Sequence, residues 1–167
     1  HNLGVILPFI TNYYFSTVIT GIQVVAYNNG YNIILFVTND SPERELAIME
    51  NLSVSSLDGL LVSISSDSDS CNHFQEIVDE GIPVVFFDRV ASEIETSKVM
   101  QDDYNGAFEA VEHLIGNGYK RIAHIAGPKG LSFTEARLQG YLEALKKHHI
   151  EPNEDWVIYS GFSQEHG

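Results

Sequence analysis

Short apolar runs alternate along the chain with longer segments in which apolar residues recur every three or four positions. The runs are typical of strands that are buried on both faces of a parallel sheet, and the longer segments are typical of amphipathic helices. The pattern predicts strands at 3–8, 31–38, 58–62, 82–87, 98–101, 121–126 and 156–159, and helices at 14–28, 42–52, 72–80, 104–116 and 135–149. Because right-handed crossovers place helices on both faces of a parallel sheet, this order predicts the α/β class.

Polar residues, proline and glycine mark the ends of several predicted helices. Ser41 is a typical N-cap and is followed by Pro42 at the first helical position. Asp102 or Asp103 is expected to cap a helix that ends at Gly116. That helix is followed by a turn and a new strand, so we expect one domain at 1–117 and the beginning of a second at 118–167. The second segment is too short for a core of its own.

The net charge and the cysteine content limit the partners and the cellular location that we expect for this chain. The sequence has 9 Lys and Arg against 23 Asp and Glu, a formal net charge of −14. So acidic a surface repels phosphate backbones and anionic lipids, and we expect no nucleic-acid or membrane face here. A single cysteine, Cys71, excludes an internal disulfide, and no secretory leader opens the sequence. These features favour a reducing, cytoplasmic location.

Candidate ligand residues cluster where the predicted strands end, which is where open parallel sheets bind ligands. Three consecutive aromatic residues, Tyr13, Tyr14 and Phe15, follow the first strand, and Asp88-Arg89 follows the fourth. Aromatic rings stack on the C–H faces of sugars, and carboxylate and guanidinium groups form paired hydrogen bonds with vicinal hydroxyls. The pattern therefore favours a sugar-like ligand.

Short motifs follow one another in a fixed order along nearly the whole chain. They are Gly4-Val-Ile-Leu-Pro8, Asn12-Tyr-Tyr-Phe15, Gly21-Ile22, Gly30-Tyr31, Asp58-Gly-Leu60, Ile82-Pro-Val84, Asp88-Arg89, Val99-x-x-Asp102, Gly118-Tyr-Lys-Arg-Ile-Ala-His-Ile-Ala-Gly-Pro128, Arg137-x-x-Gly-Tyr141 and Ala144-Leu145. Each motif is weak alone, but the ordered set resembles the effector-binding core of the bacterial lactose/galactose-repressor (LacI/GalR) family of transcription regulators.

This resemblance implies a periplasmic-binding-protein-like fold of two α/β subdomains hinged around a ligand cleft, the second of them truncated here. It implies a small-molecule effector, most often a sugar, and operator DNA bound through a headpiece that would precede His1. It also implies a homodimer formed through the helix at 16–29 and the strand that begins at Asn32.

The resemblance also assigns the ligand contacts. The corresponding positions in sugar-binding relatives are Asn12, Tyr14, Phe15, Ser63, Asp88, Arg89, Arg137 and Phe162. Each has a structural alternative. Tyr14 and Phe15 are also suited to packing the first helix, Asp88-Arg89 to a salt bridge, and Arg137 to an ion pair with Glu135. Ser63 departs from the asparagine that is often found at its position.

Other chemistry finds little support in the sequence. The histidines lack metal-ligand spacing, no glycine-rich phosphate loop follows a strand, and no nucleophile–base pair stands out. We therefore expect no enzyme activity, cofactor or metal. A periplasmic sugar-binding protein of a transport system is the alternative to a regulator, because the two classes share this fold.

Overall fold

The computed structural model describes residues 1–11, 13–52, 56–66 and 71–161. The chain forms two compact units, His1–Met100 and Gln101–Gly167, called unit 1 and unit 2 below. Unit 1 contains β1 (Asn2–Leu7), α1 (Tyr13–Asn28), β2 (Asn32–Val37), α2 (Pro42–Asn51), β3 (Gly59–Val62), α3 (Asn72–Asp79), β4 (Val84–Phe87) and β5 (Ser97–Val99). Within these described ranges, no helix is long and apolar enough to cross a membrane.

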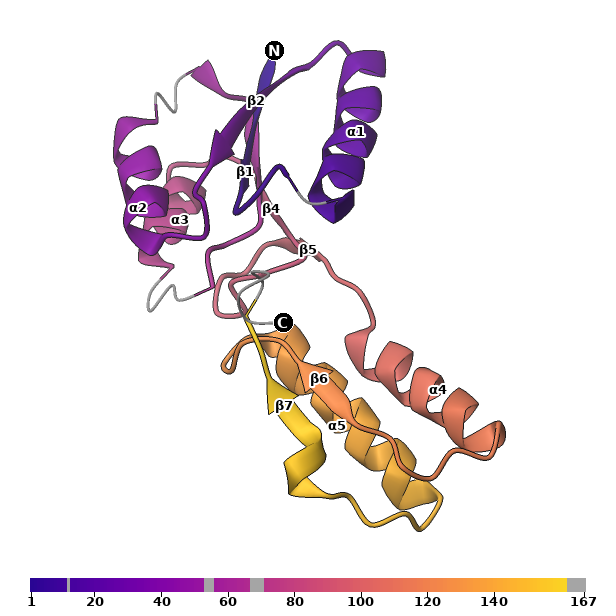
Figure 1. Cartoon of the computed structure of the whole chain (residues 1–167). Helices are drawn as coiled ribbons and strands as arrows, with labels where there is room; N and C mark the ends of the chain where they lie inside the picture. Colours follow the sequence, from indigo (N-terminus) through magenta and orange to yellow (C-terminus); the bar gives the residue numbers. More distant parts are fainter. Residues whose placement is uncertain (12, 53–55, 67–70, 162–167) are drawn as a thin grey trace. The chain divides into compact units, whose positions relative to one another are not determined.

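The strands of unit 1 form one five-stranded sheet in the order β2-β1-β3-β4-β5, and every neighbouring pair is parallel. Helix α1 covers one face of this sheet, while α2 and α3 cover the other (Figure 1). This arrangement confirms the predicted α/β class, with parallel strands flanked by helices.

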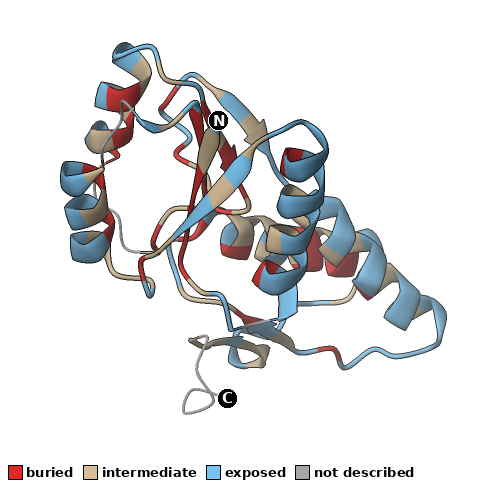
Figure 2. Cartoon of the chain, turned by 90° about the horizontal axis from the view of Figure 1, so that it is seen from above, coloured by how far each residue is buried: buried red, intermediate tan, exposed pale blue. Residues whose placement is uncertain are grey.

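The inner strand β1, which lies between β2 and β3, supplies core residues to both faces of the sheet. Val5 and Leu7 belong to the cluster that includes Phe15 of α1, whereas Ile6 belongs to the cluster that includes Phe74 of α3. Burial on both sides explains why this strand is apolar without alternation. Figure 2 shows that the inner strands of unit 1 are mostly buried, whereas the outer faces of its helices are exposed.

The predicted helix caps of α2 and of α4 (Asp103–Gly116) are present. The Ser41 side chain accepts a hydrogen bond from the Arg44 N–H at 3.2 Å, and Pro42 occupies the first helical position. The Asp102 side chain accepts from the Asn105 N–H at 3.1 Å, so Asp102 rather than Asp103 is the cap of α4. These side chains satisfy N–H groups that have no partner inside the helix.

In unit 2, α4 packs on α5 (Ser132–Lys147), and α5 packs on a two-stranded parallel sheet. Its strands are β6 (His124–Ala126) and β7 (Val157–Tyr159), and a single 3₁₀ turn at Glu154–Trp156 precedes β7. Strand β6 is shorter than the predicted run at 121–126. Ile125 and Ile158 are exposed on this sheet, whereas Ile122, just before β6, is buried in the apolar cluster of unit 2.

The two compact units divide between Met100 and Gln101, not at the predicted boundary between 117 and 118. Helix α4 belongs with the second unit because its Val111 lies in one apolar cluster with Tyr141 and Leu145 of α5. The Tyr141 hydroxyl, which is buried, also donates a hydrogen bond to the Ile122 carbonyl at 2.9 Å.

The packing of α4 on α5 depends on a glycine at their closest approach. A Cβ atom at Gly140 would lie 2.2 Å from the backbone oxygen of Tyr104 and 3.0 Å from the backbone nitrogen of Phe108. Both neighbours are main-chain atoms of α4, so they cannot turn aside as a flexible side chain would. Gly106 on α4, by contrast, has no atom within 4 Å of its Cβ position.

We expect Gly140→Ala to lower the free energy of unfolding of the full-length protein by about 1–3 kcal/mol, because α4 and α5 must move apart. Gly106→Ala is the matched control and should be neutral or stabilising by up to about 1 kcal/mol, since alanine is the better helix former. Urea denaturation followed by circular dichroism measures both changes. Equal stability of the two variants would contradict the proposed close packing.

Candidate functional site

The candidate site lies at the carboxyl ends of the strands in unit 1. The strand order places β2 on one side of β1 and β3 on the other, so the sheet has a topological switch point between β1 and β3. Open parallel sheets bind ligands at such a point, beyond the carboxyl ends of the strands. Ser63 directly follows β3, and Asp88 directly follows β4.

The structure brings two of the candidate ligand residues, Ser63 and Asp88, together. The Ser63 hydroxyl donates a hydrogen bond to Asp88 Oδ2 at 3.4 Å, and Ser63 is fully buried. Asp88 has a left-handed backbone conformation, with φ of 60°, and its N–H donates to the Val99 carbonyl at 3.1 Å. A left-handed residue other than glycine costs roughly 1–2 kcal/mol, and such strain concentrates at functional sites.

Arg89 also lies at this edge, in a buried ion pair. Its Nη1 atom is 2.5 Å from Asp40 Oδ1 and donates to the Ser66 hydroxyl at 2.8 Å. Only 5% of Arg89 is exposed. The salt-bridge alternative for Arg89 is therefore realised, with Asp40 as the partner.

Sequence reasoning did not single out Asp40, although a signal existed. Asp40 comes just after the second predicted strand, and the carboxyl end of every strand in a parallel sheet belongs to the ligand edge. Asn39 and Asp40 are both left-handed, with φ of 53° and 60°, a conformation that these two residue types tolerate better than most. The turn that they form begins directly at the end of β2.

A second carboxylate, Glu45 of α2, is fully buried next to this edge. Glu45 Oε2 accepts a hydrogen bond from the Ser65 N–H at 2.7 Å, and Oε1 lies 3.2 Å from His73 Nε2.

The buried Cys71 lies in the core of the same unit. Burial is the main cause that raises the pKa of its thiol to about 12, and the negative charges of Glu93 and Glu45 add to the effect. The thiol therefore stays protonated at neutral pH and is not a nucleophile.

The predicted aromatic residues have different environments. Phe15 is buried in the cluster with Val5 and Leu7, which matches the packing alternative. Tyr14 is 38% exposed, and its ring meets the ring of Phe15 edge-on at a centroid distance of 5.2 Å. Tyr14 is therefore the more accessible of the two. Asn12 and Phe162 lie outside the described residues.

Arg137 belongs to unit 2, on α5. Its Nε atom donates to Asp103 Oδ1 at 2.7 Å, and its guanidinium lies 5.0 Å from the centre of the Phe133 ring. The observed ion pair is with Asp103 rather than with Glu135. The Arg137 side chain is 47% exposed, so it remains accessible to a ligand.

Unit 2 also holds a partly buried histidine on β6. Burial, and then the charge of Arg137, lower the pKa of His124 below its ordinary value, so its ring is neutral at pH 7. The ring stacks on Tyr141 at a centroid distance of 5.1 Å. Among the residues that the structure describes, no group of His, Cys, Asp or Glu has a geometry that could hold a metal ion.

Comparison with known proteins identifies the family. Residues 1–166 match the family described as periplasmic binding proteins and sugar binding domain of LacI family, and the chain belongs to it. A curated relative is the HTH-type transcriptional repressor PurR of Vibrio vulnificus, which is 29% identical over 96% of this chain and 48% of its own length. The chain thus spans about half the length of the curated relatives that it matches.

Solved structures agree with this assignment. The transcription regulator CcpA of Lactococcus lactis has a TM-score of 0.85 and 29% identity, covering 98% of this chain and 60% of that one. A LacI family transcriptional regulator from Enterococcus faecium with bound ribose has a TM-score of 0.79 and 27% identity, covering 99% of this chain and 60% of that one. These likenesses confirm the resemblance read from the ordered motifs.

Proposed function

We propose that the chain is the ligand-sensing core of a bacterial transcription regulator and that it binds a small effector, a sugar, through residues of both units. The observation that carries this proposal is the Ser63–Asp88 pair at the switch-point edge of a sheet of this family. A relative with bound ribose supports a sugar as the effector. The relatives named as transcriptional repressors support a regulatory rather than an enzymatic role, carried out in the cytoplasm.

The chemistry of the edge suits a polyhydroxylated ligand. A carboxylate such as that of Asp88 can accept hydrogen bonds from two neighbouring hydroxyls of a sugar, and a serine hydroxyl such as that of Ser63 can both donate and accept. The accessible ring of Tyr14 offers an apolar face to the C–H groups of a sugar ring. Arg137 would supply donors from unit 2, and such charge-assisted bonds are stronger than neutral ones.

The acidic charge of the chain separates sensing from DNA binding. With a net charge of −14, these residues repel a phosphate backbone, so we assign operator contacts to a headpiece outside this sequence. The effector would act by binding one arrangement of the two units better than another. The ratio of the effector's affinities for the two arrangements sets the largest change in operator affinity that the effector can cause.

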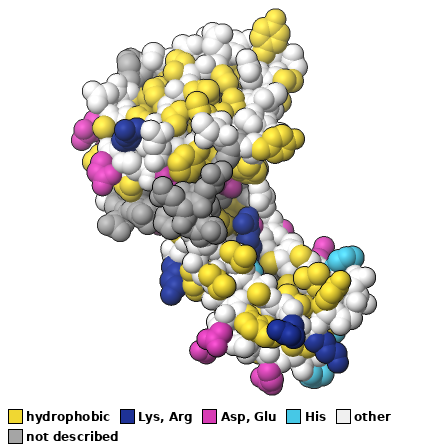
Figure 3. All heavy atoms as spheres, in the orientation of Figure 1, with side chains coloured by type: hydrophobic (Ala, Val, Ile, Leu, Met, Phe, Trp, Pro, Cys, Tyr) yellow, Lys and Arg dark blue, Asp and Glu magenta, His cyan; other side chains and the backbone are white. Residues whose placement is uncertain are grey.

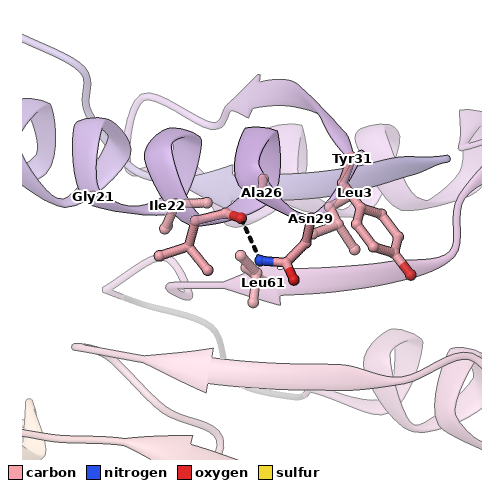
Figure 4. Close-up of a pocket in the computed structure, with 8 residues that line it drawn as sticks. Leu3, Gly21, Ile22, Ala26, Asn29, Tyr31 and Leu61 are labelled. Atoms are coloured by element: carbon pink, nitrogen blue, oxygen red, sulfur yellow. Dashed lines mark hydrogen bonds between the residues drawn. The ribbon is translucent and has the colours of Figure 1, made fainter.

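A homodimer would form through the outer surface of α1 and the edge strand β2. Val25 and Tyr27 on α1 are 64% and 80% exposed, and Ile34 and Leu35 of β2 are also exposed. Apolar side chains gather on this face of unit 1 (Figure 3). Beside α1 lies a groove of about 520 Å³ lined by Leu3, Gly21, Ile22, Val25, Ala26, Asn29, Tyr31 and Leu61 (Figure 4).

The effector is tested on the full-length protein by a thermal-shift screen of pentoses, hexoses, disaccharides and nucleosides, beginning with D-ribose. A ligand at 100 times its dissociation constant adds about 2.7 kcal/mol to stability. Calorimetric titration of the active compound should then show its affinity reduced about 10- to 150-fold in Asp88→Ala and in Arg137→Ala. That factor corresponds to a lost hydrogen bond to a charged group, about 1.5–3 kcal/mol.

Asp79→Ala and Arg121→Ala are the matched controls, because both residues are exposed and lie away from the candidate site. They should keep full affinity. If both Asp88→Ala and Arg137→Ala bound the effector with unchanged affinity, these two residues would not be effector contacts and would have only a structural role. A screen in which no sugar or nucleoside stabilises the protein would contradict the proposed effector class.

We expect the full-length protein to sediment as a dimer at micromolar concentration and Tyr27→Asp to sediment as a monomer, because a carboxylate on the α1 surface would be desolvated in the interface. Tyr119→Asp places the same change on an exposed tyrosine of unit 2 and should leave the dimer intact. A strict monomer before mutation would instead favour the periplasmic sugar-binding alternative.

A further inference from the structure

The loop that follows β3, residues 63–66, is held through every one of its backbone N–H groups. The first two donate to main-chain carbonyls: Ser63 to Ile6 of β1 at 2.9 Å, and Ile64 to Arg89 at 3.2 Å. These bonds hold the loop to the inner strand β1 and to the turn after β4. They continue the pattern of a sheet beyond the last paired residue of β3.

The next two N–H groups donate to carboxylates. Ser65 donates to Glu45 Oε2 at 2.7 Å, and Ser66 donates to Asp40 Oδ1 at 2.9 Å. Hydrogen bonds to a charged acceptor are roughly twice as strong as neutral ones. Two successive loop residues are thus fixed by two acidic side chains, one from α2 and one from the turn after β2.

Asp40 also holds the turn that carries Asp88. Its Oδ1 atom pairs with Arg89 Nη1 at 2.5 Å, and its Oδ2 atom accepts from the Ser66 hydroxyl at 2.7 Å. Arg89 is the next residue after Asp88, so one carboxylate fixes both the β3 loop and the β4 turn. The positions of Ser63 and Asp88 relative to each other depend on this link.

Glu45 secures the loop from its other side. Its second oxygen is 3.2 Å from His73 Nε2, and the Ser65 hydroxyl donates to Thr38 Oγ1 at 3.0 Å. Glu45, Thr38 and Ser65 are all buried, where an unpaired polar group is costly. The hydrogen-bonded network therefore has little freedom to rearrange without losing bonds.

We infer that Asp40 and Glu45 are positioning residues of the effector site, holding Ser63 and Asp88 in their binding arrangement before the effector arrives. This inference rests on the proposed function. Neither residue is assigned a contact with the effector. Both reduce the ordering that binding must bring about, which is how preorganisation raises affinity.

The test uses the full-length protein and the nearly isosteric variants Asp40→Asn and Glu45→Gln. Amide hydrogen exchange is measured by NMR without any ligand. We expect exchange at Ser66 to accelerate about tenfold or more in Asp40→Asn, and exchange at Ser65 to accelerate similarly in Glu45→Gln. Glu50→Gln is the matched control, an exposed glutamate on the same helix, and should leave both amides unchanged.

Selective acceleration distinguishes positioning from a general loss of stability. A merely structural role would accelerate the core amides of β1, such as those of Val5 and Ile6, to the same degree as the loop. That result, or unchanged exchange at Ser65 and Ser66 in both variants, would overturn the inference. If Glu45→Gln does not fold, Asp40→Asn alone decides, because its charge is only partly buried.

Titration with D-ribose separates this inference from the proposed function. We expect Asp40→Asn to weaken binding at least fivefold while Glu50→Gln binds normally. If the unaltered protein binds neither D-ribose nor another sugar, the proposed function fails, and the exchange measurement alone then judges whether Asp40 and Glu45 hold the loop. Selective loop exchange with unaltered sugar affinity in Asp40→Asn would also overturn the positioning role.

Discussion

A parallel sheet with an inner strand that is apolar on both faces must be covered on both sides, and unit 1 is built around that requirement. The side chains of β1 alternate between two apolar clusters, one beneath α1 and one beneath α2 and α3. Each crossover must return to the same end of the sheet, so all the loops that follow the strands collect at one edge. The position of the candidate site is therefore a consequence of how the core is buried.

The same geometry leaves backbone N–H and C=O groups at that edge without hydrogen-bond partners in the sheet. The strands stop there, their backbone groups lose their neighbours in the sheet, and the surrounding core excludes water. Asp40 and Glu45 accept hydrogen bonds from the backbone N–H groups of the loop after β3, and their carboxylates are themselves paired, with Arg89 and with His73. A buried ion pair adds little net stability compared with apolar packing, but it defines one arrangement sharply because breaking it is costly. These paired charged groups therefore fix the arrangement of the loops at the ligand-binding edge more than they stabilise the fold.

Much of the fold was predictable, because periodicity reports burial directly. The strands of unit 1 and the caps Ser41 and Asp102 followed from local patterns, whereas the hydrogen bond between Ser63 and Asp88 joins residues 25 positions apart and could not be read from them. Glu45 was missed because a glutamate among charged residues in an amphipathic helix resembles a solvated position. The unit boundary was missed because periodicity shows that α4 has an apolar face but not which neighbour covers it. The partner of Arg89 could not be named from the sequence, because Asp40 lies 49 positions away, beyond the reach of any local pattern.

Cys71 gives the molecule a built-in reporter. It is the single cysteine of the chain, it is buried beside Phe74 and Phe86 in the core of unit 1, and its thiol is held protonated by its surroundings. A thiol in that state reacts only when the structure around it opens. The rate at which a thiol-directed reagent labels Cys71 in the native protein would therefore measure how often the structure around α3 opens. No engineered probe is needed, and no other cysteine in this sequence would contribute to the signal.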